Sequence, residues 1–194
     1  MLWRPRMDDA LLVQAFQRTG EEAHFKALVE RHRGPTFRLI LSILGAGQHA
    51  VSEELTQDVF LKVYRRLGQF RGEAKFSTWL YRIAHNQAVD YRASARFRAT
   101  YCGHEVLDMT PTDRPLDNPF TSASAGRTAS VVNDCLARLP HLYRSVLHQH
   151  YWMGMTVAEI SATLSAPEGT VKSYMHRARA KLHKLLAEKG ISDV

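Results

Sequence analysis

The chain has 194 residues and a formal net charge of +7, with 26 Lys and Arg against 19 Asp and Glu. This length has room for two small domains rather than one large one. Two cysteines give no framework for a secreted disulfide fold, and neither a signal-peptide core nor an apolar run of membrane-spanning length is present. We therefore expect a cytoplasmic protein.

The charge is unevenly distributed along the chain. Residues 1–98 carry 16 basic and 10 acidic side chains, residues 99–126 carry 1 and 4, and residues 127–194 carry 9 and 5. Two basic blocks separated by an acidic segment are typical of two DNA-contacting modules joined by a spacer that does not follow the phosphate backbone.

The first basic block shows helical periodicity and no alternating strand pattern of useful length. Asp8 or Asp9 caps a short helix that Gly20 ends. A longer helical stretch follows, in which Gly34-Pro35 predicts a kink or a break. A third helix is expected to open at Ser52, and a fourth to run from near Ser77 to about Arg96.

Residues 70–92, between and within the last two of these helices, interleave aromatic rings with cations. Rings stack on unpaired bases, Arg and Lys neutralise phosphates, and amides can read base edges. An amphipathic helix with all its aromatics in the core is the alternative, and for Trp79, Ile83 and Tyr91 we favour it. It does not explain the polar, Gly-containing loop 70–76, which is framed by two rings.

Residues 99–126 are rich in Pro, Asp, Ser and Thr and cannot bury enough apolar surface to fold alone. We predict a flexible linker here. Cys102 lies within it, and a redox role for this thiol stays open. Cys135, among Val131, Val132, Leu136 and Leu139, is expected to be a small core residue.

The last basic block predicts a second helical domain that begins near Arg127 and includes a helix over about 141–151. Thr156 and Glu159 form a capping box for the next helix. Pro167 and Gly169 then break the periodicity, and a further helix follows from about Thr170. Cationic and polar side chains cluster in its first turns, which is typical of a helix-turn-helix whose second helix enters the major groove.

No motif indicates catalysis, a cofactor or a metal. The chain has neither type of phosphate-binding glycine loop nor a zinc-hydrolase pattern. His148 and His150 are two residues apart, so on a helix they point to different faces. We expect no enzyme activity, no cofactor and no metal site.

The motifs resemble those of bacterial extracytoplasmic-function (ECF) sigma factors of the sigma-70 family. Phe70-Arg71-Gly72-Glu73, with Phe76, the run 78–84 and Asn86, resembles the promoter-melting region. The segments 168–173 and 176–179 closely resemble the helix that reads the minus-thirty-five element, and 134–140 with 143–147 resembles the helices before it.

The resemblance implies an all-α fold of two small helical domains. It implies a promoter-melting domain over 8–98, the flexible linker 99–126 and a helix-turn-helix domain over 127–190. The implied minus-ten contacts are Phe70, Arg71, Gly72, Glu73, Lys75, Phe76, Trp79, Arg82, Asn86 and Asp90. The implied minus-thirty-five contacts are Thr170, Lys172, Ser173, His176, Arg177 and Arg179. Gln57, Asp58 and Lys62 are implied to contact the polymerase.

The implied partners are core RNA polymerase, promoter DNA as duplex and as non-template single strand, and an anti-sigma factor that is often membrane-anchored. Two alternatives remain: a helix-turn-helix regulator that acts without core polymerase, and a helical adaptor that binds only protein. A long linker also lets the domains fold toward one another, so we expect the free protein to be compact and to bind duplex promoter DNA poorly.

Overall fold

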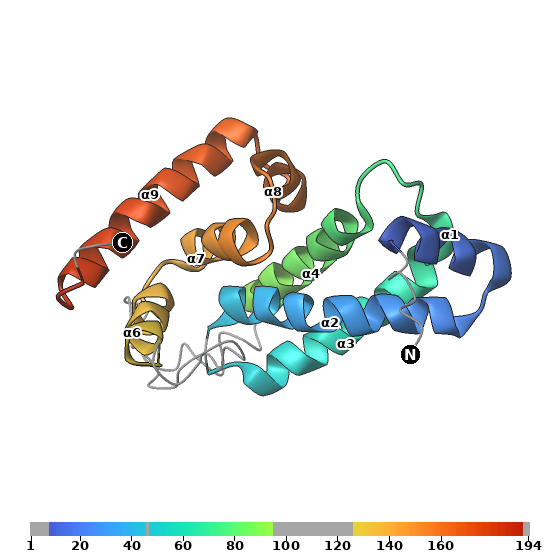
Figure 1. Cartoon of the computed structure of the whole chain (residues 1–194), viewed down its shortest axis with the longest axis horizontal. Coiled ribbons are helices and arrows are strands. Elements are labelled where there is room, and N and C mark those ends of the chain that lie inside the picture. Colours follow the sequence, from blue (N-terminus) through green and yellow to red (C-terminus); the bar gives the residue numbers. More distant parts are fainter. Residues whose placement is uncertain (1–7, 46, 95–125, 192–194) are drawn as a thin grey trace, which may run out of the picture.

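The computed structural model describes residues 8–45, 47–94 and 126–191, and these residues are helical with no strand among them. The first group of helices is α1 (Asp9–Thr19), α2 (Glu22–Leu44), α3 (His49–Arg66) and α4 (Phe76–Ala93). The second is α6 (Gly126–Ala137), α7 (His141–Leu147), α8 (Val157–Leu164) and α9 (Glu168–Ala187) (Figure 1). The predicted all-α class is confirmed. Residues 99–125 of the predicted linker, with Cys102, lie outside the described residues.

The first helix begins and ends as its sequence predicts. The carboxylate of Asp8 accepts a hydrogen bond from the Asp9 amide at 2.7 Å, which satisfies one of the free donors of the first turn. Gly20 adopts a left-handed conformation with φ 70°, and its N–H donates to the Phe16 carbonyl at 2.8 Å. Glycine adopts this conformation without the steric cost that a Cβ brings.

Several helices differ from their predicted limits: α4 ends at Ala93 rather than near Arg96, α9 begins at Glu168 rather than at about Thr170, and α2 and α3 differ as follows. α2 continues through Pro35 without a break. Burial of Leu39, Ile40 and Ile43 beyond the proline outweighs the cost of about 3 kcal/mol that proline imposes inside a helix. α3 begins at His49 rather than at Ser52, because Ser52 is fully buried against the bundle and does not cap the helix.

The core of the first group lies where α2, α3 and α4 meet. Leu28, Val59, Val63 and Leu80 are completely buried there. At the α1 end of the bundle the aromatic rings of Phe16, Phe25, Phe60 and Tyr64 contact one another edge to face or tilted. This packing fixes α4 on the bundle and leaves one face of α4 free of the core.

The second group contains the predicted helix-turn-helix. Thr156 Oγ1 accepts a hydrogen bond from the Glu159 amide, and the Glu159 carboxylate accepts one from the Thr156 amide at 2.8 Å, so the capping box is confirmed. Ser165 ends α8 with φ 51°. A left-handed conformation is rare for a residue with a side chain. A short π-helix, η2 (His148–Trp152), extends α7.

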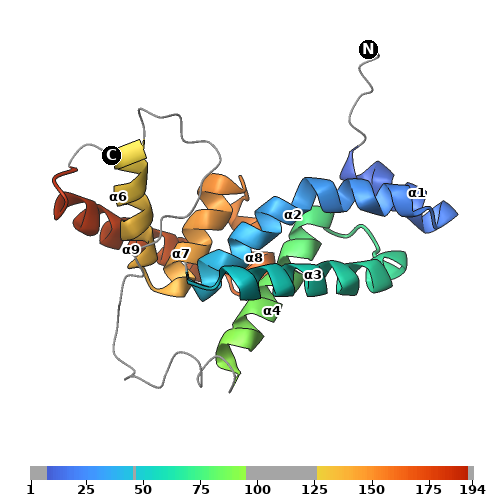
Figure 2. The same cartoon turned by 90° about the horizontal axis from the view of Figure 1, so that it is seen from below.

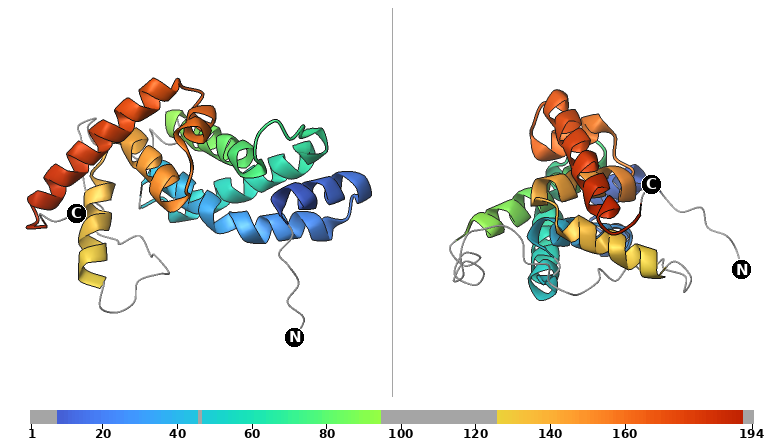
Figure 3. Two further views of the ribbon diagram at one scale, coloured as in Figure 1. Left: turned by 45° about the horizontal axis from the view of Figure 1, so that its top comes forward. Right: turned by 90° about the vertical axis from the view of Figure 1, so that its left-hand side faces the viewer.

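The two groups of helices pack directly against each other. α7 lies along α2, and α8 lies against α4 (Figures 2 and 3). Val146, Met155, Ile160, Val171 and Met175 of the second group belong to the same contiguous apolar cluster as the core of the first. A second cluster, which includes Cys135 as predicted, joins α6, α7 and α9.

Candidate nucleic-acid and polymerase interfaces

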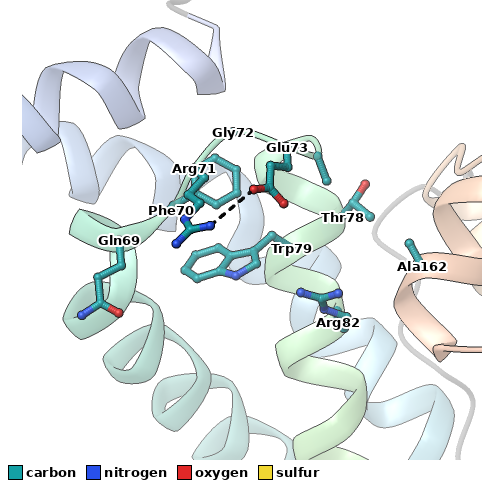
Figure 4. A pocket seen from close by; sticks show the side chains of 10 residues that line it. Gln69, Phe70, Arg71, Gly72, Glu73, Thr78, Trp79, Arg82 and Ala162 are labelled. Carbon is teal, nitrogen blue, oxygen red and sulfur yellow. Dashed lines mark ion pairs between the residues drawn. The ribbon is translucent and has the colours of Figure 1, made fainter.

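The loop between α3 and α4 encloses one side of a pocket of about 360 Å³. Figure 4 shows the ring of Trp79 from α4 on the pocket wall, with Phe70 and Arg71 of the loop beside it. The lining residues are Gln69, Phe70, Arg71, Gly72, Glu73, Ala74, Thr78, Trp79, Arg82 and Ala162. The volume falls within the range of pockets that hold small organic ligands, which is about 300–1,000 Å³.

The loop is held by a side chain from α1. Gln17 Nε2 donates to the carbonyl of Leu67 at 2.8 Å and to that of Phe70 at 2.9 Å. The ring centroids of Phe70 and Trp79 lie 5.0 Å apart. Gly72 turns the chain with φ 73°, and no neighbouring atom lies near the position a Cβ would take. The loop therefore needs glycine at this position because of the positive φ angle, and not because a side chain would collide with neighbouring atoms.

The cations at the pocket are exposed, whereas one of the predicted aromatic contacts is not. Arg71, Lys75 and Arg82 are exposed. Arg71 forms only a loose ion pair with Glu73, at 3.9 Å, with both side chains in solvent. Phe76 is 3 % exposed, with its ring edge-on to Phe70 at 6.2 Å. In this structure Phe76 supports the pocket wall and does not reach the pocket.

The free face of α4 carries the other predicted minus-ten residues. Arg82, Asn86 and Asp90 are all exposed. They recur every four residues, so they line one face of the helix next to the pocket. The opposite face is buried through Leu80 and Ala84. Exposure on one continuous face allows these side chains to contact a strand that leaves the pocket.

A buried polar chain fixes α4 against α1 and α2. His32 Nε2 lies 2.7 Å from Asp9 Oδ2, and its Nδ1 lies 3.1 Å from the Tyr81 hydroxyl. Burial lowers the pKa of His32, although the Asp9 carboxylate acts in the opposite direction. Burial also raises the pKa of Tyr81, and the nearby Asp9 charge adds to this effect. Tyr81 therefore stays a neutral hydrogen-bonding group that holds α4 in position.

The predicted minus-thirty-five residues lie on the outer face of α9. Lys172, Ser173, His176, Arg177 and Arg179 are exposed, and Thr170 is half-buried. The inner face is anchored by Val171, Met175 and Ala178, all buried. Ser173 Oγ donates to the Gly169 carbonyl at 3.0 Å, and Lys172 pairs loosely with Glu168 at 3.9 Å. These contacts are weak enough to be exchanged for phosphates.

The predicted polymerase residues lie on the solvent side of α3. Gln57, Asp58 and Lys62 are exposed, and the apolar side chains of Leu61 and Tyr64 beside them are 55 % and 40 % exposed. A groove of about 700 Å³, lined by residues of α2 and α3, adjoins them. A patch of large exposed apolar side chains beside a groove is typical of a protein interaction site.

Three contacts around the pocket come from distant parts of the sequence and were not predicted. Gln17 of α1 holds the loop, Ala162 of α8 lines the pocket, and Glu159 of α8 pairs with Lys75 at the end of the loop. Each acts over a long separation in sequence, and no local pattern signals such a contact. Within the described ranges, no three His, Cys, Asp or Glu side chains gather to hold a metal ion, and no helix is long and apolar enough to cross a membrane.

Comparison with protein families identifies the chain. Residues 28–98 match sigma-70 region 2, and residues 130–182 match sigma-70 region 4. The RNA polymerase sigma-H factor of Pseudomonas aeruginosa is 30% identical over 92% of this chain and 93% of its own length. The ECF RNA polymerase sigma factor SigL of Mycobacterium tuberculosis is 30% identical over 89% of this chain and 94% of its own length. The chain belongs to the ECF sigma factors.

Solved structures share the fold of this ECF sigma factor. CnrH, solved in complex with the cytosolic domain of CnrY, is 25% identical with a TM-score of 0.63, over 93% of this chain and 97% of that one. The sigma factor RpoE of Bartonella quintana, solved with the anti-sigma factor NepR, has a TM-score of 0.65 over 84% of this chain and 96% of that one, at 21% identity.

Family membership gives the function. As an ECF sigma factor, the protein associates with core RNA polymerase and directs promoter-specific transcription initiation. It is a transcription factor rather than a member of an enzyme family. The family match is also consistent with the two sets of helices, because region 2 falls on α2–α4 and region 4 on α6–α9.

Proposed function

We propose that residues 8–98 form the domain that recognises and melts the minus-ten element, and that residues 127–190 read the minus-thirty-five element. In this scheme residues 99–126 serve as a linker that sets the distance between the two. The proposal is supported by the positions of the pocket loop, which joins α3 and α4 in the first set of helices, and of the cationic face of α9 in the second set.

The loop pocket would receive a base extruded from the non-template strand. Extrusion costs a few kcal/mol of lost stacking. A base that stacks on an aromatic ring regains about 1–3 kcal/mol, and Trp79 and Phe70 are the rings available. Arg71, Lys75 and Arg82 would neutralise the flanking phosphates, with Gly72 and Glu73 shaping the loop.

The face of α4 beyond the pocket would read the rest of the minus-ten element. Asn86 can donate to and accept from a base edge. Asp90 repels phosphates, so its role would be to accept from a cytosine amino group or to orient Asn86. In the second domain, Lys172, His176 and Arg177 would enter the major groove, with Thr170, Ser173 and Arg179 at its edge.

Gln57, Asp58 and Lys62 would contact the polymerase from α3, and the exposed Leu61 and Tyr64 would add apolar area to that interface. We also propose regulation by an anti-sigma factor, since the structural relatives CnrH and RpoE were solved with the cytosolic domain of CnrY and with NepR. Because its partners are polymerase and promoter DNA, we propose that the protein acts in the cytoplasm.

The observation that best supports this assignment is the pocket lined by Phe70 and Trp79, which lies beside the exposed face of α4 with Arg82, Asn86 and Asp90. A protein that recognises only duplex DNA does not need a pocket for an extruded base. A fluorescent base analogue placed in the minus-ten region of a promoter provides the test. We expect its emission to rise on open-complex formation with core polymerase, and to rise further with the Trp79→Ala variant, because stacking on Trp79 partly quenches the analogue. A helix-turn-helix regulator would bind the duplex alone without this change, and a protein-only adaptor would not bind DNA.

A further inference from the structure

Basic side chains from four elements gather where the second set of helices packs on the first. They are Arg38 of α2, His85 and Arg92 of α4, His141 and Arg144 of α7, and His148 of η2. Among the described residues, no carboxylate forms an ion pair with any of these three histidines. Each further positive charge weakens a contact of this composition, because like charges repel strongly where water is excluded.

Arg144 already places one positive charge inside the contact. Its buried guanidinium donates to the Ser42 carbonyl of α2 and to the Ala137 carbonyl. Burial, together with the charge of Arg92, lowers the pKa of Arg144 to about 10, so the side chain is still charged at neutral pH. The two carbonyls compensate this charge, and the histidines near it have to stay neutral.

His141, the first residue of α7, faces the two arginines and a histidine of the cluster. Burial lowers its pKa to about 4, and Arg92 and His85 of α4 and Arg144 of α7 act in the same direction. His85 in turn has a pKa lowered by burial, and its Nδ1 is buried without a hydrogen-bond partner among the described residues. A proton on either imidazole would therefore add a charge that the contact does not neutralise.

His148 occupies a similar position against α2. Its Nε2 is buried, and none of the described residues accepts a hydrogen bond from it, so a proton added there would have no acceptor. Burial, followed by the charge of Arg38 on α2, lowers the pKa of His148 to about 4. Two separate points of the contact, at His141 and at His148, therefore depend on a neutral imidazole.

The size of the pH effect on the contact follows from these pKa values. The pKa of each imidazole is depressed below 6.5 in the packed form, so its contribution to the contact is fully present above about pH 6.5 and is lost as the pH falls toward 4. An imidazole that becomes solvated on release has an ordinary pKa of about 6.5. From pH 7.5 to pH 5.5, the ratio of released to packed protein then rises about tenfold for each of the two histidines.

We propose that this contact is an acid-sensitive switch, in which protonation of His141 and His148 separates α7, η2 and α8 from α2 and α4 while both sets of helices stay folded. The second set keeps an apolar core of its own, the cluster that joins α6, α7 and α9. Release also moves Ala162 of α8 away from the loop pocket, which it lines in the packed form. Mild acid would thus make the pocket and the adjoining face of α4 more accessible.

A thiol buried in the contact reports its opening in the full-length protein. Val146→Cys, combined with Cys102→Ser, places this thiol in the apolar cluster that the two sets share, where Val146 is completely buried. Native Cys135 is the internal control, because it is buried in the cluster of the second set alone and stays covered unless that set unfolds. Rates of labelling by a thiol reagent are divided, at each pH, by the rate for the same Cys in a short peptide.

From pH 7.5 to pH 5.5, the normalised labelling at position 146 should rise about 100-fold, about tenfold for each of the two histidines, while that of Cys135 stays constant. Replacing both His141 and His148 with Phe should remove this rise, apart from the share of His85. The matched control, His49→Phe with His183→Phe, removes two exposed imidazoles and should respond as the wild type does.

Three results would overturn the proposal. They are a labelling rate at position 146 that does not change with pH, a variant without His141 and His148 that responds as fully as the wild type, and a parallel rise at Cys135. The last result would show that acid unfolds the second set instead of releasing it. The assay needs neither polymerase nor DNA, so its outcome does not depend on the proposed promoter-reading function.

Discussion

Acidification should destabilise the folded chain through His148, which lies at the junction of α7 and η2. Burial and the positive charge of Arg38 on α2 lower the pKa of this imidazole to about 4, from an ordinary value of 6.5. Its ring stacks on Trp152 with the centroids 5.8 Å apart, and its Nε2 has no hydrogen-bond partner among the described residues. The packed protein therefore holds a neutral imidazole that the unfolded chain would protonate.

The direction and size of the pH effect on stability follow from the difference between the pKa of His148 in the folded chain and in the unfolded chain. Because the folded pKa is depressed, the stability that His148 contributes is fully present above about pH 6.5 and is lost as the pH falls toward 4. Each pH unit in that window costs about 1.4 kcal/mol, so a change from pH 7 to pH 5 should lower the free energy of unfolding by about 2 kcal/mol.

Urea denaturation at the two pH values, on the wild type and on His148→Phe, isolates this contribution. Phe keeps a ring against Trp152 but cannot titrate, so the variant should lose about 2 kcal/mol less on acidification. Other groups that titrate in this range cancel in the difference. His183→Phe, at an exposed position of α9, should behave as the wild type does. Equal losses for His148→Phe and the wild type would refute the reasoning.

Four further predictions concern the turn, the two DNA surfaces and the loop. Ser165→Gly should relieve the left-handed strain at φ 51° and raise the melting temperature by a few degrees, corresponding to up to about 1 kcal/mol, whereas Ser165→Ala should not. Replacing Lys172 and Arg177 together with Ala should reduce the salt slope of duplex binding by about 1.8 and spare open-complex formation on a pre-melted template; equal loss on both templates would assign them to the fold. Asn86→Ala should change the rank order of a panel of minus-ten variants with polymerase binding intact, and an unchanged order would exclude it as a reader. Gln17→Leu removes the hydrogen bonds to the loop, so it should cost about 1 kcal/mol of stability and weaken single-strand binding. If the variant bound single strands as the wild type does, the loop would not depend on these hydrogen bonds.

Local signals predicted much of the fold. The Asp8 cap, the stop at Gly20 and the Thr156–Glu159 capping box are decided by side chains within a few residues of the helix end, and all three appear in the structure. The placement of Arg82, Asn86 and Asp90 on one face of α4 follows from helical spacing alone. These features need no knowledge of which surfaces meet.

Features decided by tertiary packing could not be predicted from local sequence. α2 passes through Pro35 because the residues beyond it are buried, and Ser52 packs inside the bundle instead of capping α3. The π-turn at η2 inserts a residue that no local pattern marks. Phe76 is in the core because the loop folds back over it.

The candidate site was predicted only in part, because some of its contacts also depend on tertiary packing. The motif at residues 70–75 located the pocket loop, since its rings, cations and glycine are close in sequence. Gln17, about fifty residues earlier, and Glu159, more than eighty residues later, meet that loop only in the folded chain. The exposure of Leu61 beside the polymerase residues likewise depends on how α2 and α3 pack.

The most direct measurement of the central claim is transcription in vitro from a genomic DNA library by core RNA polymerase, with and without this protein, followed by mapping of the 5′ ends. The account predicts a small set of defined start sites that require the protein, preceded by two shared sequence elements. These sites should be lost with Trp79→Ala at the pocket and with Lys172→Ala and Arg177→Ala on α9. Start sites unchanged from those of core polymerase alone, with the protein bound to neither polymerase nor melted DNA, would contradict it.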